Sequence, residues 1–600
     1  FAAQMQQLVW GGRQPELQER ALLRVLPALA ARGHLQPAVV DQLVAGYRFL
    51  RDVEHCLQAE HDRQTQKLPT ADRSRLRLAV AMGYPGPGAF EQALDAHRLR
   101  IARVFGDLVG ASDQSDSAGL ALWLDPLREG ALAAGGFREP AVAGASLVDL
   151  AVVRDRASVG AEGRQRLDRL MPMLLERLRS CPEPDLTLAR VAPVLKAILR
   201  RSAYLALLAE NPAALERFLD LAGRSRWLAE ALARRPAFFD ALLERQPSDA
   251  QAASSVPARA TLVADLEARI SVAASDGEER VLETLREFRE QHVFNVALGE
   301  VRGTLSLMHA SDYLTFLAEA VLEIALGRAW QENAARMQQY PWPQPFIIVG
   351  YGKLGGIELG PGSDLDLVFL HDLPGTPGPF LHRLVRRVLH ILSVPTYSGT
   401  LYEVDMRLRP SGNAGPMVSG LDAFRDYQSG DAWTWEHQAL VRARSVAGDP
   451  GLRARFEALR QEILCRPRPS DRLRFEVRDM RRRMRAHVGA ATDLKRASGG
   501  IIDIEFIVQY LVLAHAHAHP ALAVWSDNVR ILDVAGELGL LDGDTAAALR
   551  AAYLALRAEW HRSVLDLPDH HRAERVLEAH RATVERVWRA LLEAPDGGSV

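Results

Sequence analysis

The two ends of the chain repeat each other, and this repeat constrains the fold more than any other feature of the sequence. Three residues of the C-terminal region recur at the start of the chain at one constant offset, with Phe506, Gln509 and Pro520 matching Phe1, Gln4 and Pro15. Residues 551–561 (AAYLALRAEWH) likewise match residues 45–55 (AGYRFLRDVEH). Apolar residues in both copies recur every three or four positions, which is the period of a helix with one buried face. We therefore expect the chain to begin inside one helical module and to end with a second copy of it.

A β-containing segment precedes the second copy of the repeat. By symmetry, we expect an equivalent segment before Phe1, so the sequence is interpreted as part of a longer protein. Composition shifts and polar stretches predict five parts: a helical part over residues 1–112, a linker over 113–118, a helical region over 119–335, a small α/β domain over 336–425, and a helical domain over 426–600 that repeats 1–112. The predicted fold class is mostly α with one small α/β domain.

Composition and charge exclude several classes of protein. The 600 residues are 48% hydrophobic and 25% charged, which is the balance of a globular protein. The 73 Lys and Arg residues face 75 Asp and Glu residues, so the chain lacks the charge of a basic nucleic-acid-binding protein. No signal peptide or membrane span is predicted. A reducing, cytoplasmic compartment is expected because the three cysteines lie too far apart for a disulfide framework: Cys56, Cys181 and Cys465.

Three short segments within residues 336–425 carry the pattern of β-strands. The run from Phe346 to Gly352 (FIIVGYG) is apolar and rich in β-branched residues, which is typical of a buried strand. The segment from Ser363 to His371 (SDLDLVFLH) is the second candidate, and the alternating segment from Leu401 to Arg409 (LYEVDMRLR) is the third. Between them, residues 380–394 have helical period, and after about Leu421 the pattern predicts helices to the end of the chain.

Three aspartates on the predicted strands form the candidate catalytic centre. Side chains alternate between the two faces of a strand, so Asp364 and Asp366 are expected on one face and Leu365 and Leu367 in the core. The same alternation places Asp405 where it would complete a cluster of three carboxylates if the second and third strands pair. Neighbouring carboxylates stay ionised only beside a cation, and hard oxygen ligands suit Mg²⁺ or Mn²⁺. The pattern predicts a divalent-metal site that can support phosphoryl chemistry.

A glycine-rich loop and nearby basic residues provide candidate phosphate contacts. The loop between the first two strands contains Gly352, Lys353, Gly355 and Gly356, and glycines allow backbone N–H groups to approach a phosphate. Lysine is rare in this chain, which favours a specific role for Lys353 and for Lys495. The alternating strand also carries two arginines, suited to neutralising phosphate charge: Arg407 and Arg409.

These motifs resemble a known family. The segment from Phe346 to Leu370 (FIIVGYGKLGGIELGPGSDLDLVFL) resembles the nucleotidyltransferase superfamily typified by DNA polymerase β and, more narrowly, the glutamine synthetase adenylyltransferases. Five further segments are similar to that family: SDYLTFLAEAVLEIAL (311–326), YEVDMRLRPSGNAGP (402–416), AWTWEHQALVRAR (432–444), GGIIDIEFIVQYL (499–511) and WSDNVRIL (525–532). The stretch Val293-Phe294-Asn295-Val296 departs from the family pattern.

The resemblance implies both an activity and a set of site residues. The family enzymes are bifunctional: a first unit removes AMP from glutamine synthetase by phosphorolysis, and a second unit transfers AMP from ATP to a tyrosine of glutamine synthetase. This chain would hold the end of the first unit and the whole second unit, with the PII signalling protein and glutamine as regulators. The family's metal-binding carboxylates match Asp364, Asp366 and Asp405, and its nucleotide contacts match Gly362, Ser363 and the loop over residues 352–356.

Four residues of the C-terminal half are further candidates for supporting the site: Glu436, Lys495, Asp503 and Glu505. For these residues, ordinary structural roles remain open, such as carboxylates stabilised at a helix N-terminus. Two other functions also remain open for the whole chain. One is a nucleotidyltransferase that acts on RNA or a small molecule, and the other is a non-catalytic fragment that binds a partner through its helices. The near-neutral charge argues against RNA, and retention of all three aspartates argues against a non-catalytic role.

Overall fold

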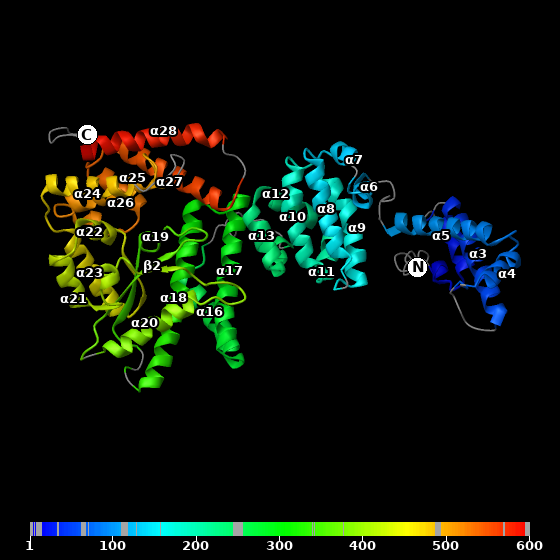
Figure 1. Cartoon of the computed structure of the whole chain (residues 1–600), viewed down its shortest axis with the longest axis horizontal. Helices are drawn as coiled ribbons and strands as arrows, with labels where there is room; N and C mark the ends of the chain where they lie inside the picture. Colours follow the sequence, from blue (N-terminus) through cyan, green and yellow to red (C-terminus); the bar gives the residue numbers. More distant parts are fainter. Residues whose placement is uncertain are drawn as a thin grey trace. The chain divides into compact units, whose positions relative to one another are not determined.

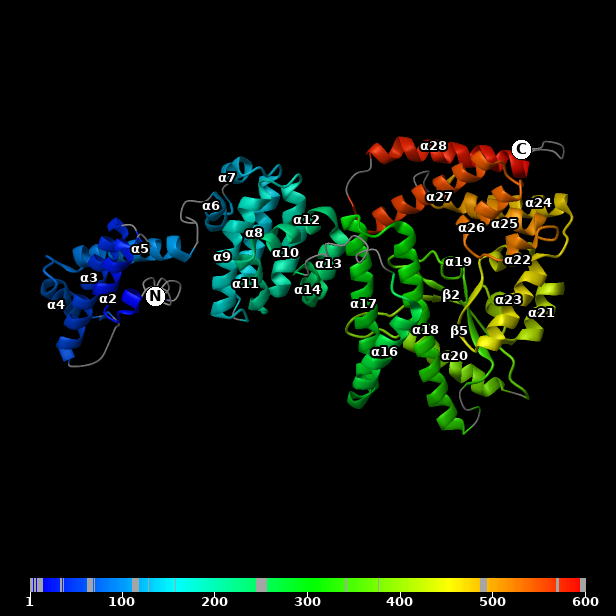
Figure 2. The ribbon, with the colours of Figure 1, turned by 180° about the vertical axis from the view of Figure 1, so that it is seen from behind.

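A computed structural model describes most of the chain (Figures 1 and 2). The described residues are Gln4, Gln7, 15–32, 35, 37–61, 68–69, 71–109, 118–127, 129–156, 158–243, 256–338, 340, 343–375, 377–485, 494–567 and 571–593. The predicted linker at 113–118 lies outside them except for its last residue. The chain divides into two compact units, the first comprising residues 1–145 and 168–179 and the second comprising residues 146–167 and 180–600.

The first unit is helical, as the apolar periodicity predicts. Its core gathers leucines and valines from helices α2, α3 and α5, including Leu26, Leu29 and Val40. A second cluster joins Val53 and Phe90. The helices of this unit are α2 (Leu22–Ala31), α3 (Pro37–His61), α4 (Asp72–Ala81), α5 (Pro87–Val109), α6 (Ala118–Leu124) and α7 (Glu129–Ala134), and α8 (Pro140–Arg154) and α9 (Ala161–Leu178) are shared with the second unit.

The second unit begins with two groups of helices. Short helices come first, of which α12 and α13 are strongly amphipathic: α10 (Pro184–Ile198), α11 (Ser202–Glu210), α12 (Pro212–Arg224), α13 (Arg226–Arg234), the 3₁₀ turn η2 (Pro236–Phe238) and α14 (Phe239–Leu243). Three long helices follow: α16 (Arg259–Ala273), α17 (Glu278–Arg302) and α18 (Leu307–Met337). Helix α18 is buried along much of its length because it supports the sheet that comes next.

A five-stranded mixed sheet lies at the centre of the second unit. Strand β1 (Phe346–Tyr351) pairs antiparallel with β2 (Leu365–His371) on one side and with β5 (Arg444–Gly448) on the other. Strand β2 pairs in parallel with both β3 (Val404–Asp405) and β4 (Val418–Gly420). The predicted fold class is confirmed at this level, because a small sheet is embedded in a mostly helical chain. The sheet also continues past residue 425 through β5.

Alternating side chains of the central strands face two different cores. Ile347 and Val349 face the core that includes helices α22 to α28, whereas Phe346 and Ile348 face the core that includes α16 to α18. Figure 1 shows α22 and α23 on one side of β2 and α16 to α18 on the other. This burial explains why the run FIIVGYG contains no charged residue, since a strand buried on both faces exposes neither face to water.

Helices cover the rest of the second unit. They are α19 (Gly352–Gly355), α20 (Gly378–Ser393), α21 (Leu421–Gly430), α22 (Thr434–Val441), α23 (Pro450–Leu464), α24 (Ser470–Arg485), α25 (Ile501–His515), α26 (Asn528–Glu537), α27 (Gly543–Val564) and α28 (His571–Trp588). Residues 506–526 contain no Asp, Glu, Lys or Arg. They form most of α25 and the turn after it. No helix among the described residues has the length and apolar character needed to cross a membrane.

The prediction of the third strand is largely wrong. Only Val404 and Asp405 are paired, instead of the whole segment from Leu401 to Arg409. The backbone amides of Leu401 and Tyr402 bind the carbonyl of Leu392 at the end of α20, so the start of the segment is held by a helix. After Asp405 the chain turns, and the N–H of Arg409 bonds to the carbonyl of Met406.

Strands β4 and β5 were not predicted. Strand β4 precedes Leu421, whereas β5 contradicts the expectation of helices alone after about Leu421. Strand β5 (RSVAG) is short and ends in glycine, so its local strand preference is weak. It forms because the free edge of β1 offers a ladder that buries Val446 and Ala447. Gly448 has φ of +102°, and a Cβ there would lie 2.2 Å from the carbonyl oxygen of Phe346, so only glycine fits at this close crossing.

One buried arginine fastens α23 to the neighbouring segments. The guanidinium group of Arg460 donates hydrogen bonds to the carbonyls of Leu440 (3.1 Å), Val441 (2.5 Å), Ala523 (2.8 Å) and Trp525 (2.9 Å). The side chain is 1% exposed, so water cannot replace these donors. A planar group with five N–H donors is needed to satisfy four carbonyls at once.

We predict that Arg460→Lys lowers the free energy of unfolding by about 3–5 kcal/mol, because a single ammonium group leaves several buried carbonyls without a donor. Chemical denaturation of the whole chain, followed by circular dichroism, measures the change. The matched control is Arg455→Lys on the same helix, since the Arg455 side chain is 49% exposed and pairs with Asp372 at the surface. Equal destabilisation by the two substitutions would contradict the role given to Arg460.

Candidate active site

Strand pairing brings the three predicted catalytic aspartates into one neighbourhood. In the parallel register of β2 and β3, Asp366 lies opposite Asp405, and Leu365 lies opposite Val404. Asp364 directly precedes β2 and its side chain is 53% exposed, whereas Leu365 is fully buried. The alternation read from the sequence is therefore correct: the leucines enter the core and the carboxylates remain on the other side.

The glycine-rich loop begins beside the same carboxylates. Tyr351 pairs with Asp366 across β1 and β2, so Gly352 comes next to that aspartate. Gly352 has φ of +56°, and a Cβ at this position would lie 2.5 Å from Oδ2 of Asp366. Glycine is required here for both reasons, because any side chain would strain the backbone and strike the carboxylate. The short helix α19 begins at this residue.

The neighbouring charges shift the pKa values of the aspartates in opposite directions. Burial, together with the negative charges of Asp364 and Asp405, raises the pKa of Asp366 to about 6. A hydrogen bond from Arg407, outweighing the effect of burial, lowers the pKa of Asp405. Asp366 is therefore the carboxylate whose ionisation gains most from a nearby cation.

Carboxylate oxygens are the ligands that a hard cation such as Mg²⁺ prefers, but the side chains of the three aspartates do not point toward one common position. Among the described residues, no group of three or more His, Cys, Asp or Glu side chains is placed to hold a metal ion. Arg407 explains this, since its backbone N–H donates to Oδ1 of Asp405 (2.8 Å) and its Nε donates to Oδ2 (2.7 Å). A divalent ion at this position would have to displace the Arg407 side chain, which is exposed and free to move away.

Two of the rare lysines meet on one tryptophan beside Asp364. The Nζ of Lys353 lies 3.7 Å from Oδ1 of Asp364 and 5.0 Å from the ring centroid of Trp560, and the Nζ of Lys495 lies 4.1 Å from the same centroid. Burial and the nearby Lys353 charge lower the pKa of Lys495 to about 8. Two ammonium groups held this close are suited to an anion such as a phosphate. The sequence shows Trp560 only as an apolar residue of a predicted helix, so its contact with the two lysines could not be predicted.

The remaining predicted nucleotide contacts lie at different depths. Gly362 is exposed with φ of +73°, and Ser363 is buried, where its Oγ accepts a hydrogen bond from the N–H of Gly360 (3.0 Å). Gly355 and Gly356 pack against Arg442, so these two glycines let the loop lie close to that residue. Arg409 donates to the carbonyl of Met406 (2.8 Å) and thereby holds the turn after β3.

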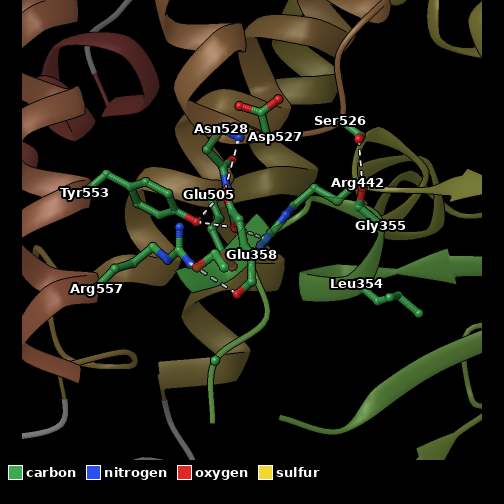
Figure 3. Close-up of polar contacts among 12 residues, drawn as sticks. Leu354, Gly355, Glu358, Arg442, Glu505, Ser526, Asp527, Asn528, Tyr553 and Arg557 are labelled. Carbon is green, nitrogen blue, oxygen red and sulfur yellow. Dashed lines mark hydrogen bonds and ion pairs between the residues drawn. The ribbon is translucent and has the colours of Figure 1, made fainter. Parts of the chain in front are cut away.

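Behind the loop lies a buried polar cluster that sequence analysis missed (Figure 3). Its centre is Glu358, which is 3% exposed and ion-paired with the buried Arg442. The hydroxyl of Tyr553 donates to Oε2 of Glu358 (2.6 Å), and Nδ2 of Asn528 donates to its Oε1 (3.2 Å). Arg557 donates to the backbone carbonyl of Glu358 (3.1 Å). The cluster thus attaches the segment between the glycine loop and β2 to helices α26 and α27.

The other candidate supporting residues serve structural contacts. Asp503 is fully buried and accepts from Arg481 (2.5 Å), Arg485 (2.6 Å) and the N–H of Gly499 (2.8 Å). Glu436 is also buried, and it caps the start of α22 by accepting from the N–H of Trp433 (2.9 Å).

Glu505 forms an ion pair with Nη1 of Arg442, whereas Glu358 pairs with Nη2 of the same guanidinium (Figure 3). Asp503 and Glu505 therefore face different partners, and only Lys495 among the four candidates joins the carboxylates of the site.

Comparison with known proteins shows which families parts of this chain are similar to. Residues 215–459, which include all five strands, match the family described as "Glutamate-ammonia ligase adenylyltransferase". The resemblance predicted from the motifs is confirmed over this part of the chain. Residues 1–109 and 472–590 both match the description "GlnD PII-uridylyltransferase". These two segments correspond to the two copies of the repeat and contain none of the strands.

Three relatives of this chain share one name, "Bifunctional glutamine synthetase adenylyltransferase/adenylyl-removing enzyme". The protein from Pseudomonas aeruginosa is 44% identical over 98% of this chain, that from Nitrosococcus oceani is 45% identical over 99%, and that from Pseudomonas putida is 41% identical over 98%. The chain spans 64% of the length of each of these relatives.

We predict that Glu358→Gln lowers the free energy of unfolding by about 3–5 kcal/mol, because it leaves the buried Arg442 with one carboxylate in place of two. Burial opposes ionisation of Glu358, but the Arg442 charge outweighs it and holds the pKa below 4.5. The stabilisation is therefore present at neutral pH and is lost as the pH falls through the lowered pKa. Denaturant unfolding at several pH values should show the gap between wild type and variant closing below about pH 4.

The matched control is Glu462→Gln, since Glu462 on α23 is 58% exposed and pairs with Arg466, just beyond the end of that helix. This substitution should change the stability by less than about 0.5 kcal/mol at any pH. A gap for Glu358→Gln that stays constant from neutral to acidic pH would contradict the assignment of the effect to its charge.

Proposed function

We propose that this chain transfers AMP from ATP to a tyrosine of glutamine synthetase and releases pyrophosphate. The tyrosyl oxygen would attack the α-phosphorus in line, and the bond from that phosphorus to the pyrophosphate oxygen would break. The observation that carries the proposal is the register of β2 and β3, which sets Asp366 opposite Asp405 beside the glycine loop. The family match over residues 215–459 and the names of the relatives support the same reaction.

The residues around the carboxylates have distinct parts in this proposal. Asp364, Asp366 and Asp405 would hold Mg²⁺ or Mn²⁺, which when bound supplies Lewis-acid activation of the phosphate. Asp405 stays ionised at neutral pH and can orient the phenol, whose pKa is otherwise near 10. Lys353 and Lys495 would bind the triphosphate, together with the backbone at Gly352.

Several finer points belong to the same proposal. The catalytic domain would be of the polymerase β-like nucleotidyltransferase type, with Gly362, Ser363 and Arg407 lining the nucleotide. The longer protein would also carry the adenylyl-removing activity, would act in the cytoplasm, and would respond to the PII protein and to glutamine. The chain spans 64% of the length of its relatives, and the removing unit would belong to the part that it does not span.

We predict that Asp366→Asn reduces the rate of AMP transfer at least about 1000-fold, because an amide neither attracts a cation nor shares the charge of the cluster. Incorporation of label from α-³²P-ATP into glutamine synthetase measures the rate. The control is Asp372→Asn, just beyond the end of the same strand, where the carboxylate is exposed and pairs with Arg455. Its rate should equal that of wild type.

Label in RNA rather than in glutamine synthetase would contradict the proposed substrate, and a wild-type rate for Asp366→Asn would contradict the proposed centre.

We further predict that removing divalent cations with EDTA abolishes transfer and that Mg²⁺ or Mn²⁺ restores it. Ca²⁺ should restore little activity, because it prefers more ligands at longer distances than a compact aspartate cluster offers. The labelled-ATP assay with each added cation measures the effect. Full activity after exhaustive chelation would contradict a role for the carboxylates as metal ligands.

A further inference from the structure

One tryptophan beside the glycine loop contacts two of the chain's four lysines. The ring centroid of Trp560, near the end of α27, lies 4.1 Å from the Nζ of Lys495 and 5.0 Å from the Nζ of Lys353. Lys353 belongs to α19 and Lys495 precedes α25, so the two ammonium groups come from segments that are distant in sequence. The ring of Trp560 is the contact that both of them have in common.

The fold holds this ring in one place. A Cβ at Gly360 would lie 2.6 Å from Cζ3 of Trp560, so the ring packs directly on the backbone that leads to Asp364. The ring of His561 lies 5.3 Å from that of Trp560, at an angle of 72°. His561 is 2% exposed, and its Nδ1 contacts Oε1 of Glu300 on α17 (2.9 Å). Because its neighbours on two sides are fixed, the ring can set the positions of both ammonium groups.

An aromatic face attracts ammonium groups without neutralising their charge. A carboxylate in the same place would form an ion pair and cancel one of the two charges. The contact of Lys353 with Asp364 does not replace such an ion pair, because Nζ and Oδ1 are 3.7 Å apart and form no hydrogen bond. Two cations held close together repel each other. The arrangement therefore favours a ligand with several negative groups in a row, in which each ammonium group meets a separate one.

The repeat supplies an internal comparison for the position of Trp560. Residues 551–561 match residues 45–55 at one constant offset. Three polar or charged residues recur in the two copies: Tyr553, Arg557 and His561 correspond to Tyr47, Arg51 and His55. At the position of Trp560, the first copy carries Glu54, which forms an ion pair with Arg51 (2.5 Å). The helical module does not itself require tryptophan here, and tryptophan occurs in the copy that adjoins the glycine loop.

We propose that Trp560 is a positioning residue, which sets Lys353 and Lys495 as a pair for adjacent phosphates of a polyphosphate. The pair thereby selects a chain of phosphates over a single phosphate. This statement concerns polyphosphate binding alone, whereas its consequence for ATP rests on the proposed AMP transfer. Trp560 acts through the two lysines and has no contact with the reacting atoms of its own in this proposal.

Calorimetric titration of the whole chain with inorganic tripolyphosphate in EDTA tests the binding without a metal ion or a reaction. We expect tripolyphosphate to bind at least about tenfold more tightly than orthophosphate. Trp560→Leu should weaken tripolyphosphate binding at least about fivefold, and Trp560→Phe should weaken it less, because a phenyl face still attracts cations. Tetrafluorotryptophan at position 560 keeps the shape of the ring but withdraws electron density from its face, so it should weaken binding as Trp560→Leu does.

The matched control is tetrafluorotryptophan at position 525, since the ring of Trp525 contacts Arg530 at 4.7 Å instead of a lysine. Its affinity for tripolyphosphate should equal that of wild type. Unchanged affinity after fluorination at position 560 would overturn the proposal, whether or not Trp560→Leu folds. An equal loss of affinity for tripolyphosphate and orthophosphate in Trp560→Leu would overturn the selection of a phosphate chain.

The consequence for ATP is tested separately with the labelled-ATP assay. Fluorination at position 560 should raise KM for ATP at least about fivefold and change kcat by less than about twofold, because the ring acts on binding. A fall in kcat with KM unchanged would contradict the positioning role. Absence of AMP transfer by wild type under every condition would instead contradict the proposed function and leave the calorimetric result standing.

Discussion

The ion pair between Glu358 and Arg442 is the contact on which the arrangement of the second unit depends. It is buried on both sides, and Glu505 approaches Arg442 as a second carboxylate. Leaving either charge alone in this interior would cost several kcal/mol, so the segments that carry the three residues are held together. One of these segments follows the glycine loop, another leads into β5, and the third is α25. The sheet and the C-terminal helices are thereby fixed to each other at the rear of the aspartate cluster.

In front of this pair, the sheet gathers three negative charges that Arg407 and Lys353 balance only in part. Asp366 and Asp405 are opposite each other because β2 and β3 run in parallel, and Asp364 adds a third negative charge. On the other side, Lys353 and Lys495 share the face of Trp560. A site with clustered carboxylates next to clustered ammonium groups suits a metal ion and a polyphosphate together. Without them, Arg407 and Lys353 act as internal substitutes, by pairing with Asp405 and Asp364.

The sequence predicts those parts of the fold whose signal is local. Strands β1 and β2 follow from apolar runs, and the burial of Leu365 beside the exposed Asp364 follows from alternation. Strand β5 could not be predicted, because its pairing depends on the edge of a strand almost a hundred residues earlier. The role of Glu358 could not be predicted for the same reason, because its partners Arg442, Asn528 and Tyr553 are distant in sequence and meet it only in the folded chain. The contact between Asp405 and Arg407 depends on the side-chain rotamers of both residues, which a sequence pattern does not predict.

The central claim is that the three aspartates together bind a divalent ion next to the nucleotide. A crystal structure of the chain with Mn²⁺ and a non-hydrolysable ATP analogue, with anomalous diffraction to locate manganese, tests this most directly. Our account predicts an anomalous peak within about 2.0–2.4 Å of carboxylate oxygens of Asp366 and Asp405, with Arg407 turned away from Asp405. Manganese bound elsewhere, with the contact between Arg407 and Asp405 intact, would contradict it.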